Sequence, residues 1–251
     1  MMLTKQKLNI FVLDSAYMVL MTLGDSGRYL TLVGAFSILR EFKKYKVDYT
    51  KVGRATQDLD FDVYGKSITE VDYKLFQSAF SNYLGSNYNI TYYPLKTRKG
   101  STTYSFKVEY DGVVSNKLKI DFSLTKGQKY FDCQPLYLSL AKKIKLSNEL
   151  VDRRPKDKLD VALILTYLYP NGVSKSELVT LLLNTNNVFK VNSQWFTEEG
   201  MALALRSVRT FKGVSRENIE FNIQSFKILL GGLYDNRVPN NAIFRKGEWY
   251  W

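Results

Sequence analysis

The chain has 251 residues, of which 45% are hydrophobic and 14% aromatic, so it can bury a core in one or two domains and is not a disordered protein. Its 36 lysines and arginines exceed its 24 aspartates and glutamates, and the net charge of +12 favours an anionic partner such as nucleic acid, a nucleotide or a membrane surface. Histidine is absent and Cys133 is the one cysteine, which excludes histidine-based catalysis, intramolecular disulfides and multi-cysteine zinc sites.

The first half of the chain mixes helical and strand periods of apolar residues. The elements expected up to Gly85 are a helix over 5–23, a strand over 29–33, a helix opening at Gly34, a strand around Asp58 and a helix over 70–84. Four β-rich runs follow over 89–95, 102–110, 117–124 and 129–137, and Asp111-Gly112 predicts a hairpin turn.

Beyond residue 136 the apolar spacing becomes helical, with helices expected over 137–150, 157–169, 175–184, 198–211 and 217–234. We therefore predict an α+β fold. A mixed sheet flanked by helices forms one domain over 1–135, and a helical domain over 136–251 completes the active-site cleft. The apolar stretch near the start is interrupted by Asp14 and too short to span a membrane, so we expect a cytoplasmic protein without a membrane partner.

The most informative segment is Asp58-Leu59-Asp60-Phe61-Asp62, where three acids alternate with two apolar residues. On a strand the three carboxylates share one face and the apolar residues face the core. A solvated strand face explains this alternation without any function. It explains less well why all three polar residues are aspartates, which are poor strand formers.

Two other interpretations of this segment fail on their own criteria. A calcium-binding EF-hand loop starting at Asp58 needs glycine and glutamate where the chain has Val63 and Thr69. Gly65-Lys66-Ser67 resembles the end of a phosphate-binding P-loop, but the first glycine of that motif falls on Asp60. Neither a calcium loop nor a P-loop is present.

A two-metal site for phosphoryl chemistry remains. Asp58 and Asp60 supply a pair of carboxylates, and Asp121, between two apolar residues of a later β-run, supplies a third. Upstream, a strand leads into a helix at Gly34, where backbone N–H groups and the Ser37 hydroxyl can meet a phosphate.

These residues resemble a known family. A strand, a G-[GA]-x-S turn, a helix and a strand carrying R-x-T-x-D-[LI]-D are similar to the DNA polymerase β-like nucleotidyltransferases. The resemblance is greatest to the AbiEii-like toxins of abortive-infection (type IV) toxin–antitoxin systems. The matching residues are Gly34, Ser37, Arg54, Thr56, Asp58 and Asp60. Downstream, Lys143 (or Lys142) matches the lysine of an A-x-K helix, and Asp157 matches the first acid of an R-x-[RK]-D-x-x-D segment.

The resemblance implies a two-metal enzyme that moves a nucleoside monophosphate from an NTP to an acceptor. Asp58, Asp60 and Asp121 would hold Mg²⁺ or Mn²⁺, and Asp157 would position Lys143 or the acceptor. The residues expected to bind the nucleotide are Gly34, Ser37, Arg54, Thr56 and Lys143.

The resemblance implies RNA, at the 3′ end of tRNA, as the acceptor and a cognate antitoxin protein as a partner. The net charge agrees with an RNA acceptor, and the candidate RNA contacts are Lys43, Lys44 and Lys46 before the catalytic strand, together with Arg153 and Arg154. Two alternatives stay open at this point: a non-catalytic module that binds nucleic acid or protein, and an enzyme that modifies a small hydroxylated molecule.

Overall fold

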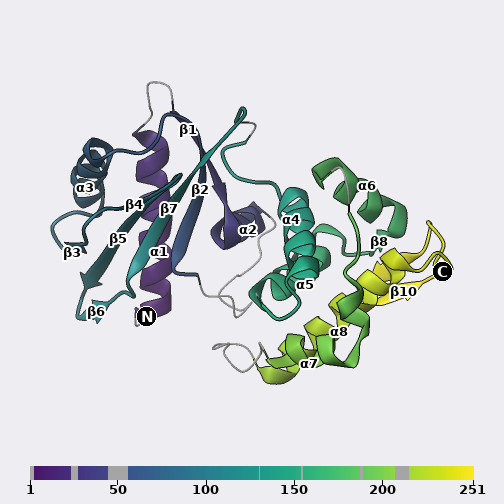
Figure 1. Ribbon diagram of the computed structural model, residues 1–251. Coiled ribbons are helices and arrows are strands. Elements are labelled where there is room, and N and C mark those ends of the chain that lie inside the picture. The colour runs from purple at the N-terminus through teal and green to yellow at the C-terminus, as the bar shows by residue number, and fades with distance from the viewer. Residues whose placement is uncertain are drawn as a thin grey trace. The chain divides into compact units, whose positions relative to one another are not determined.

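The computed structural model describes residues 3–23, 28–44, 56–129, 131–153, 155–186, 189–206 and 215–251 (Figure 1). The chain forms two compact units. The first takes in the described residues of Met1–Arg40 and Ala55–Gln134, and the second those of Glu41–Arg54 and Pro135–Trp251.

The first unit is built on a mixed β-sheet. Its elements are α1 (Lys5–Thr22), β1 (Arg28–Val33), the start of α2 (Gly34–Lys44), β2 (Asp58–Gly65), α3 (Glu70–Leu84), β3 (Asn89–Tyr92), β4 (Lys96–Arg98), β5 (Ser101–Tyr110), β6 (Val113–Val114) and β7 (Leu118–Thr125). The strand order is β1-β2-β7-β5-β3, with β4 and β6 paired to β5. The pair β2–β7 is parallel and the other pairs are antiparallel. The predicted α+β fold with a mixed sheet and helices is confirmed.

One face of this sheet carries the core of the unit. Leu59 and Phe61 from β2, with Ile120 and Phe122 from β7, are buried on it. The Phe61 ring stacks on Phe122 with centroids 5.6 Å apart and on Tyr17 of α1 at 6.3 Å. Helix α1 therefore covers this face, and α3 packs against α1 (Figure 1). The polar residues that alternate with this core set lie on the opposite face.

Local sequence signals fix several boundaries in the first unit. Thr69 and Asp72 form a reciprocal capping box at the start of α3, and Gly85 ends that helix with a positive φ of 82°. The predicted turn between β5 and β6 is confirmed, because Asp111 and Gly112 both adopt positive φ.

The predicted strand over 129–137 is wrong. Of its described residues, Cys133 makes a single bridge to Leu32 in β1, and the Gln134 amide donates to the Leu32 carbonyl at 2.8 Å. Pro135 then precedes helix α4, which begins at Leu136. Proline has no N–H to donate to a ladder and its fixed φ suits the start of a helix, so the apolar residues after it continue into α4.

The second unit combines helices with a small sheet. Its elements are α4 (Leu136–Glu149), α5 (Pro155–Leu168), β8 (Val173–Ser174), α6 (Lys175–Asn186), the 3₁₀ helix η1 (Ser193–Phe196), α7 (Glu198–Arg206), α8 (Arg216–Tyr234), β9 (Ile243–Arg245) and β10 (Glu248–Tyr250). The predicted helices are present, although residues 207–211 of the fourth lie outside the described ranges. The sheet of order β10-β9-β8 was not predicted from the sequence.

The core of the second unit centres on Trp195, which is fully buried. Its indole N–H donates to the Asn148 carbonyl at 3.1 Å, and its ring meets Phe226 of α8 with centroids 5.2 Å apart. The indole thus ties the end of α4 to α8 through η1.

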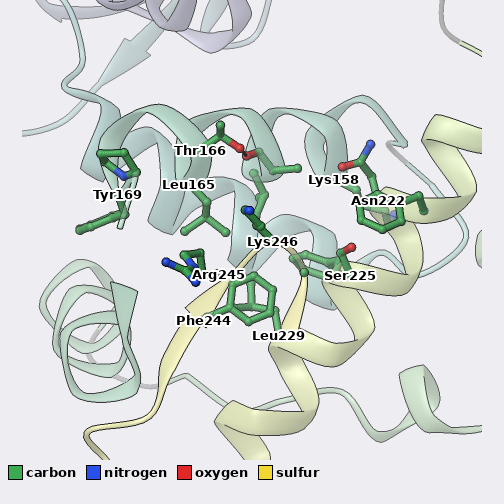
Figure 2. Close-up of a pocket in the computed structure, with 16 residues that line it drawn as sticks. Lys158, Leu165, Thr166, Tyr169, Asn222, Ser225, Leu229, Phe244, Arg245 and Lys246 are labelled. Atoms are coloured by element: carbon green, nitrogen blue, oxygen red, sulfur yellow. Dashed lines mark hydrogen bonds between the residues drawn. The ribbon is translucent and has the colours of Figure 1, made fainter. Parts of the chain in front are cut away.

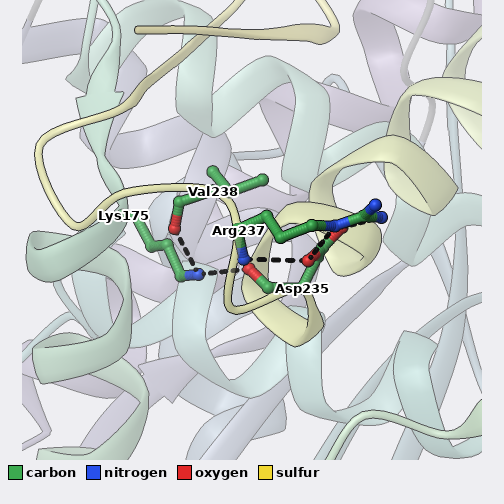
Figure 3. A network of polar contacts seen from close by, with 4 residues as sticks. All are labelled: Lys175, Asp235, Arg237 and Val238. Carbon is green, nitrogen blue, oxygen red and sulfur yellow. Dashed lines mark hydrogen bonds and ion pairs between the residues drawn. The ribbon is translucent and has the colours of Figure 1, made fainter.

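A buried lysine fixes the turn that follows α8 (Figure 3). The Lys175 ammonium donates to the carbonyls of Asp235 at 2.8 Å and Val238 at 2.9 Å. Beside it, the Asp235 carboxylate accepts hydrogen bonds from the side chain and backbone of Arg237, which lower the pKa of Asp235 from 3.8 to about 2. The Lys175 side chain is buried, whereas the Arg237 side chain is exposed.

We predict that Lys175→Met destabilises the protein by about 2–3 kcal/mol, because two buried carbonyls would be left without a charged donor. Arg237→Ala should change the unfolding midpoint little, since its ion pair is screened by solvent. Urea denaturation followed by circular dichroism measures both. Equal stabilities for the two variants would contradict the role given to Lys175.

Candidate active site

The parallel register of β2 and β7 pairs Asp60 directly with Asp121. Neighbouring strands lie about 4.8 Å apart, so these two carboxylates start from adjacent backbone positions. Both side chains are half-buried on the sheet face opposite the core. The structure therefore brings together two of the three predicted metal ligands.

The third predicted ligand, Asp58, stands two residues earlier on the same face of β2 and is exposed. Its register partner on β7 is Lys119, and its carboxylate accepts a hydrogen bond from the Gln57 amide at 3.1 Å. Thr56, predicted to bind nucleotide, is buried, and its hydroxyl donates to the Asp58 carbonyl at 3.2 Å. Thr56 thus stabilises the start of β2, the strand that carries Asp58 and Asp60.

Gly34 lies against the candidate carboxylates. The residue before it, Val33, pairs with Asp60, so the chain turns from β1 into α2 beside that aspartate. Gly34 has a φ of +72°, and a Cβ on it would lie 2.2 Å from an Asp60 carboxylate oxygen. Only glycine permits both this backbone conformation and this approach. The N-terminus of α2, where a helix favours anions, therefore lies beside Asp60.

Ser37 was predicted to contact a phosphate through its hydroxyl, but its side chain is not exposed. Its side chain is fully buried in the first turn of α2, and its hydroxyl donates to the Gly34 carbonyl at 2.8 Å. In this geometry Ser37 shapes the turn. Its predicted contact with phosphate stays a prediction, and Arg54 lies outside the described residues.

The carboxylates of Asp60 and Asp121 suit a cation whose remaining ligands are phosphate oxygens and water. Among the described residues, no group of three or more His, Cys, Asp or Glu side chains is placed to hold a metal ion. Mg²⁺ is usually bound by one or two carboxylates together with phosphate oxygens and water. Asp60 and Asp121 fit that pattern, which does not need a preformed cage of three protein ligands.

Sequence reasoning missed Thr103 of β5, which faces Asp121 across the β5–β7 pair. Its hydroxyl donates to one carboxylate oxygen of Asp121. The alternation in TTYSFKVEY was the available signal, because it places Thr103 on the same face as the aspartates once β5 and β7 are paired. Thr103 orients the Asp121 carboxylate.

The predicted residues Lys143 and Asp157 belong to the second unit, where they form a buried ion cluster. The Lys143 ammonium lies 2.6 Å from an Asp157 oxygen and 2.8 Å from an Asp160 oxygen. The two acids, three residues apart on α5, both reach α4 because residues at this spacing share one helix face. Lys142 is exposed, so Lys143 is the inward member of the lysine pair.

This geometry gives Lys143 a stabilising role that is independent of any ligand. Lys143→Met should lower the free energy of unfolding by about 3–5 kcal/mol, because it removes the ammonium that pairs with two buried carboxylates. Lys142→Met is the matched control and should change it little. Chemical denaturation of both variants measures the difference. If the two substitutions proved equally mild, the ion cluster would contribute nothing to the fold.

The second unit contains a cavity whose lining includes none of the predicted site residues (Figure 2). It has a volume of about 230 Å³ and lies between α5, α8 and the β9–β10 hairpin. Its walls include the apolar side chains Leu165, Leu229 and Phe244, and Lys246 of the hairpin also lines it (Figure 2). Its lining residues include no carboxylate, so it does not offer the chemistry expected of the active site.

In the part of the chain that the structure describes, no helix has the length and apolar character needed to cross a membrane.

No protein-family model matches the sequence, and a search of curated proteins finds no match. Among solved structures, the chain is similar to MenT4, a nucleotidyltransferase toxin from Mycobacterium tuberculosis, with a TM-score of 0.49 and 14% sequence identity. The alignment covers 93% of this chain and 86% of that chain.

Proposed function

We propose that the protein is a metal-dependent nucleotidyltransferase that moves a nucleoside monophosphate from an NTP to an acceptor hydroxyl. The observation that carries this proposal is the in-register pair of Asp60 and Asp121 beside the N-terminus of α2. A carboxylate pair binds a divalent cation, and an adjacent helix N-terminus favours phosphate. The two features together suit a metal–triphosphate substrate.

Different residues of the first unit would bind the metal, orient the acceptor and bind the phosphates. Asp60 and Asp121, with Asp58 beside them, would hold Mg²⁺ or Mn²⁺, which stabilises charge on the attacking and leaving oxygens when bound. Asp121 would orient the acceptor hydroxyl and take its proton, with Thr103 fixing the carboxylate. Backbone N–H groups after Gly34 would bind the β- and γ-phosphates. Pyrophosphate leaves as the new phosphodiester bond forms.

The remaining roles come from the family resemblance. In addition to its stabilising place in the ion cluster, Lys143 would pair with the triphosphate, and Asp157 would position it. Arg54, Thr56 and Ser37 would complete the nucleotide site. The acceptor would be RNA, at the 3′ end of tRNA, and the protein would act as a toxin restrained by an antitoxin. A small-molecule acceptor and a module without turnover are the competing possibilities, and assays of nucleotide transfer distinguish them.

Metal binding should depend on the carboxylate pair. Asp60→Asn relieves repulsion with Asp121, so the apo variant should melt at the same temperature as the wild type or slightly higher. Mg²⁺ or Mn²⁺ should then raise the melting temperature of the wild type more than that of the variant. Asp62→Asn, on the same strand face but without a predicted metal role, should respond like the wild type. Equal metal-induced shifts in all three proteins would refute the site.

Transfer itself can be tested with each labelled NTP, Mg²⁺ and total RNA. We expect label to enter RNA with the wild type and to fall by at least about a hundredfold with Asp121→Asn, since electrostatic and proton-transfer contributions of this kind are worth that much. Label on a small hydroxylated compound would identify a different acceptor class. A wild type that labels neither acceptor would point to the non-catalytic module.

A further inference from the structure

A basic groove crosses the open face of the sheet and includes Asp121. Its volume is about 620 Å³, and β4, β5, β7 and the residue before β7 line it. The lining comprises four basic residues, four hydroxyl residues and one carboxylate: Lys96, Arg98, Lys117, Lys119, Ser101, Thr103, Ser105, Ser123 and Asp121. The candidate catalytic carboxylate is thus the one acid among lining residues that otherwise carry positive charge and hydroxyl groups.

The strand register explains why these side chains gather. Thr103 of β5 pairs with Lys96 of β4 on one side and with Asp121 of β7 on the other. Two residues away, Ser105 pairs with Lys119. Because side chains alternate along a strand, all of these residues point to the face opposite the core. The basic residues therefore lie beside the hydroxyl residues and Asp121 on this face.

The charges of this groove are available to a ligand. Lys96, Arg98 and Lys119 are exposed, and no carboxylate among the described residues forms an ion pair with them. The Lys117 ammonium lies 3.9 Å from the centroid of the Tyr93 ring. A phosphodiester chain supplies the regularly spaced negative charges that such a groove attracts.

We propose that this groove, formed by Lys96, Arg98, Lys117 and Lys119, binds the 3′ segment of a single-stranded RNA and directs its terminal hydroxyl toward Asp121. The inference rests on the proposed function and adds to it the path of the acceptor. RNA fits better than DNA because the serine and threonine hydroxyls can exchange hydrogen bonds with ribose 2′-hydroxyls. This path differs from the one that sequence alone suggested, through Lys43, Lys44 and Lys46 before the catalytic strand and through Arg153 and Arg154. Of these five residues, Lys46 and Arg154 lie outside the described residues.

The experiment measures the affinity of a short fluorescent single-stranded RNA by anisotropy at several KCl concentrations, without NTP or metal. Lys96→Gln/Arg98→Gln should weaken binding about tenfold or more and reduce the log–log salt slope by about 0.7 for each phosphate that the variant no longer neutralises. Both residues lie on the exposed three-residue strand β4, so the fold should be retained, as an unchanged melting temperature would confirm. Lys117→Gln/Lys119→Gln provides a second, independent variant for which we expect the same decrease in affinity.

Two control pairs remove the same net charge elsewhere. Lys5→Gln/Lys66→Gln changes exposed lysines outside the groove, and Lys43→Gln/Lys44→Gln tests the path suggested by sequence. Both should bind RNA like the wild type. If the Lys5/Lys66 pair weakened RNA binding equally, the effect would come from overall charge. If the Lys43/Lys44 pair did so, the RNA would follow the other path. Either result would overturn the proposal. Equal affinity for the matching DNA would overturn the preference for RNA.

Measurements of NTP binding and of nucleotide transfer with the same variants separate this inference from the proposed activity. If the groove variants bound NTP more weakly but RNA as well as the wild type, the groove would be a triphosphate site and the proposal would be wrong. Groove-dependent RNA binding without nucleotide transfer by the wild type would leave the groove intact and refute the activity. If the groove variants transferred nucleotide to RNA as well as the wild type, the proposed activity would be supported and the groove would be refuted as the path of the RNA.

Discussion

The parallel pairing of β2 with β7 governs the rest of the first unit, because one register places four large apolar side chains in the core and two carboxylates together on the open face. Burying each apolar side chain contributes about 1.5–3 kcal/mol. Repulsion between two carboxylates about 5 Å apart costs about 3 kcal/mol at the effective dielectric of a protein surface. The core therefore decides the register, and a slip by one residue would bury the acids.

The protein accommodates its two carboxylate pairs in different ways. Asp157 and Asp160 are buried and share the Lys143 ammonium, which offsets one of their two negative charges. Asp60 and Asp121 are half-buried beside a helix N-terminus and a groove rich in lysine. The first arrangement is typical of a structural ion cluster. In the proposed function, the second pair binds a cation together with an anionic substrate.

Sequence patterns predicted the parts that depend on alternation and on strong turn signals. The three aspartates on one face of β2, Asp121 opposite the core and the Asp111 hairpin are all present. The patterns failed where tertiary pairing decides the structure: residues 129–137 are apolar enough for a strand, yet their described part makes one bridge before α4. The basic groove was not predicted, because β4 has three exposed residues and no periodicity. The A-x-K resemblance favoured Lys143 over Lys142, and the packing of α4 against α5 shows that Lys143 is the buried one.

The central claim is that Asp60 and Asp121 jointly bind the metal that accompanies the nucleotide. Anomalous diffraction from crystals grown with Mn²⁺ and a non-hydrolysable NTP analogue tests it most directly. We expect a manganese peak within coordinating distance of both carboxylates, with the triphosphate extending toward the turn at Gly34. A manganese–nucleotide complex bound elsewhere on the protein, with no metal at the two aspartates, would contradict the account.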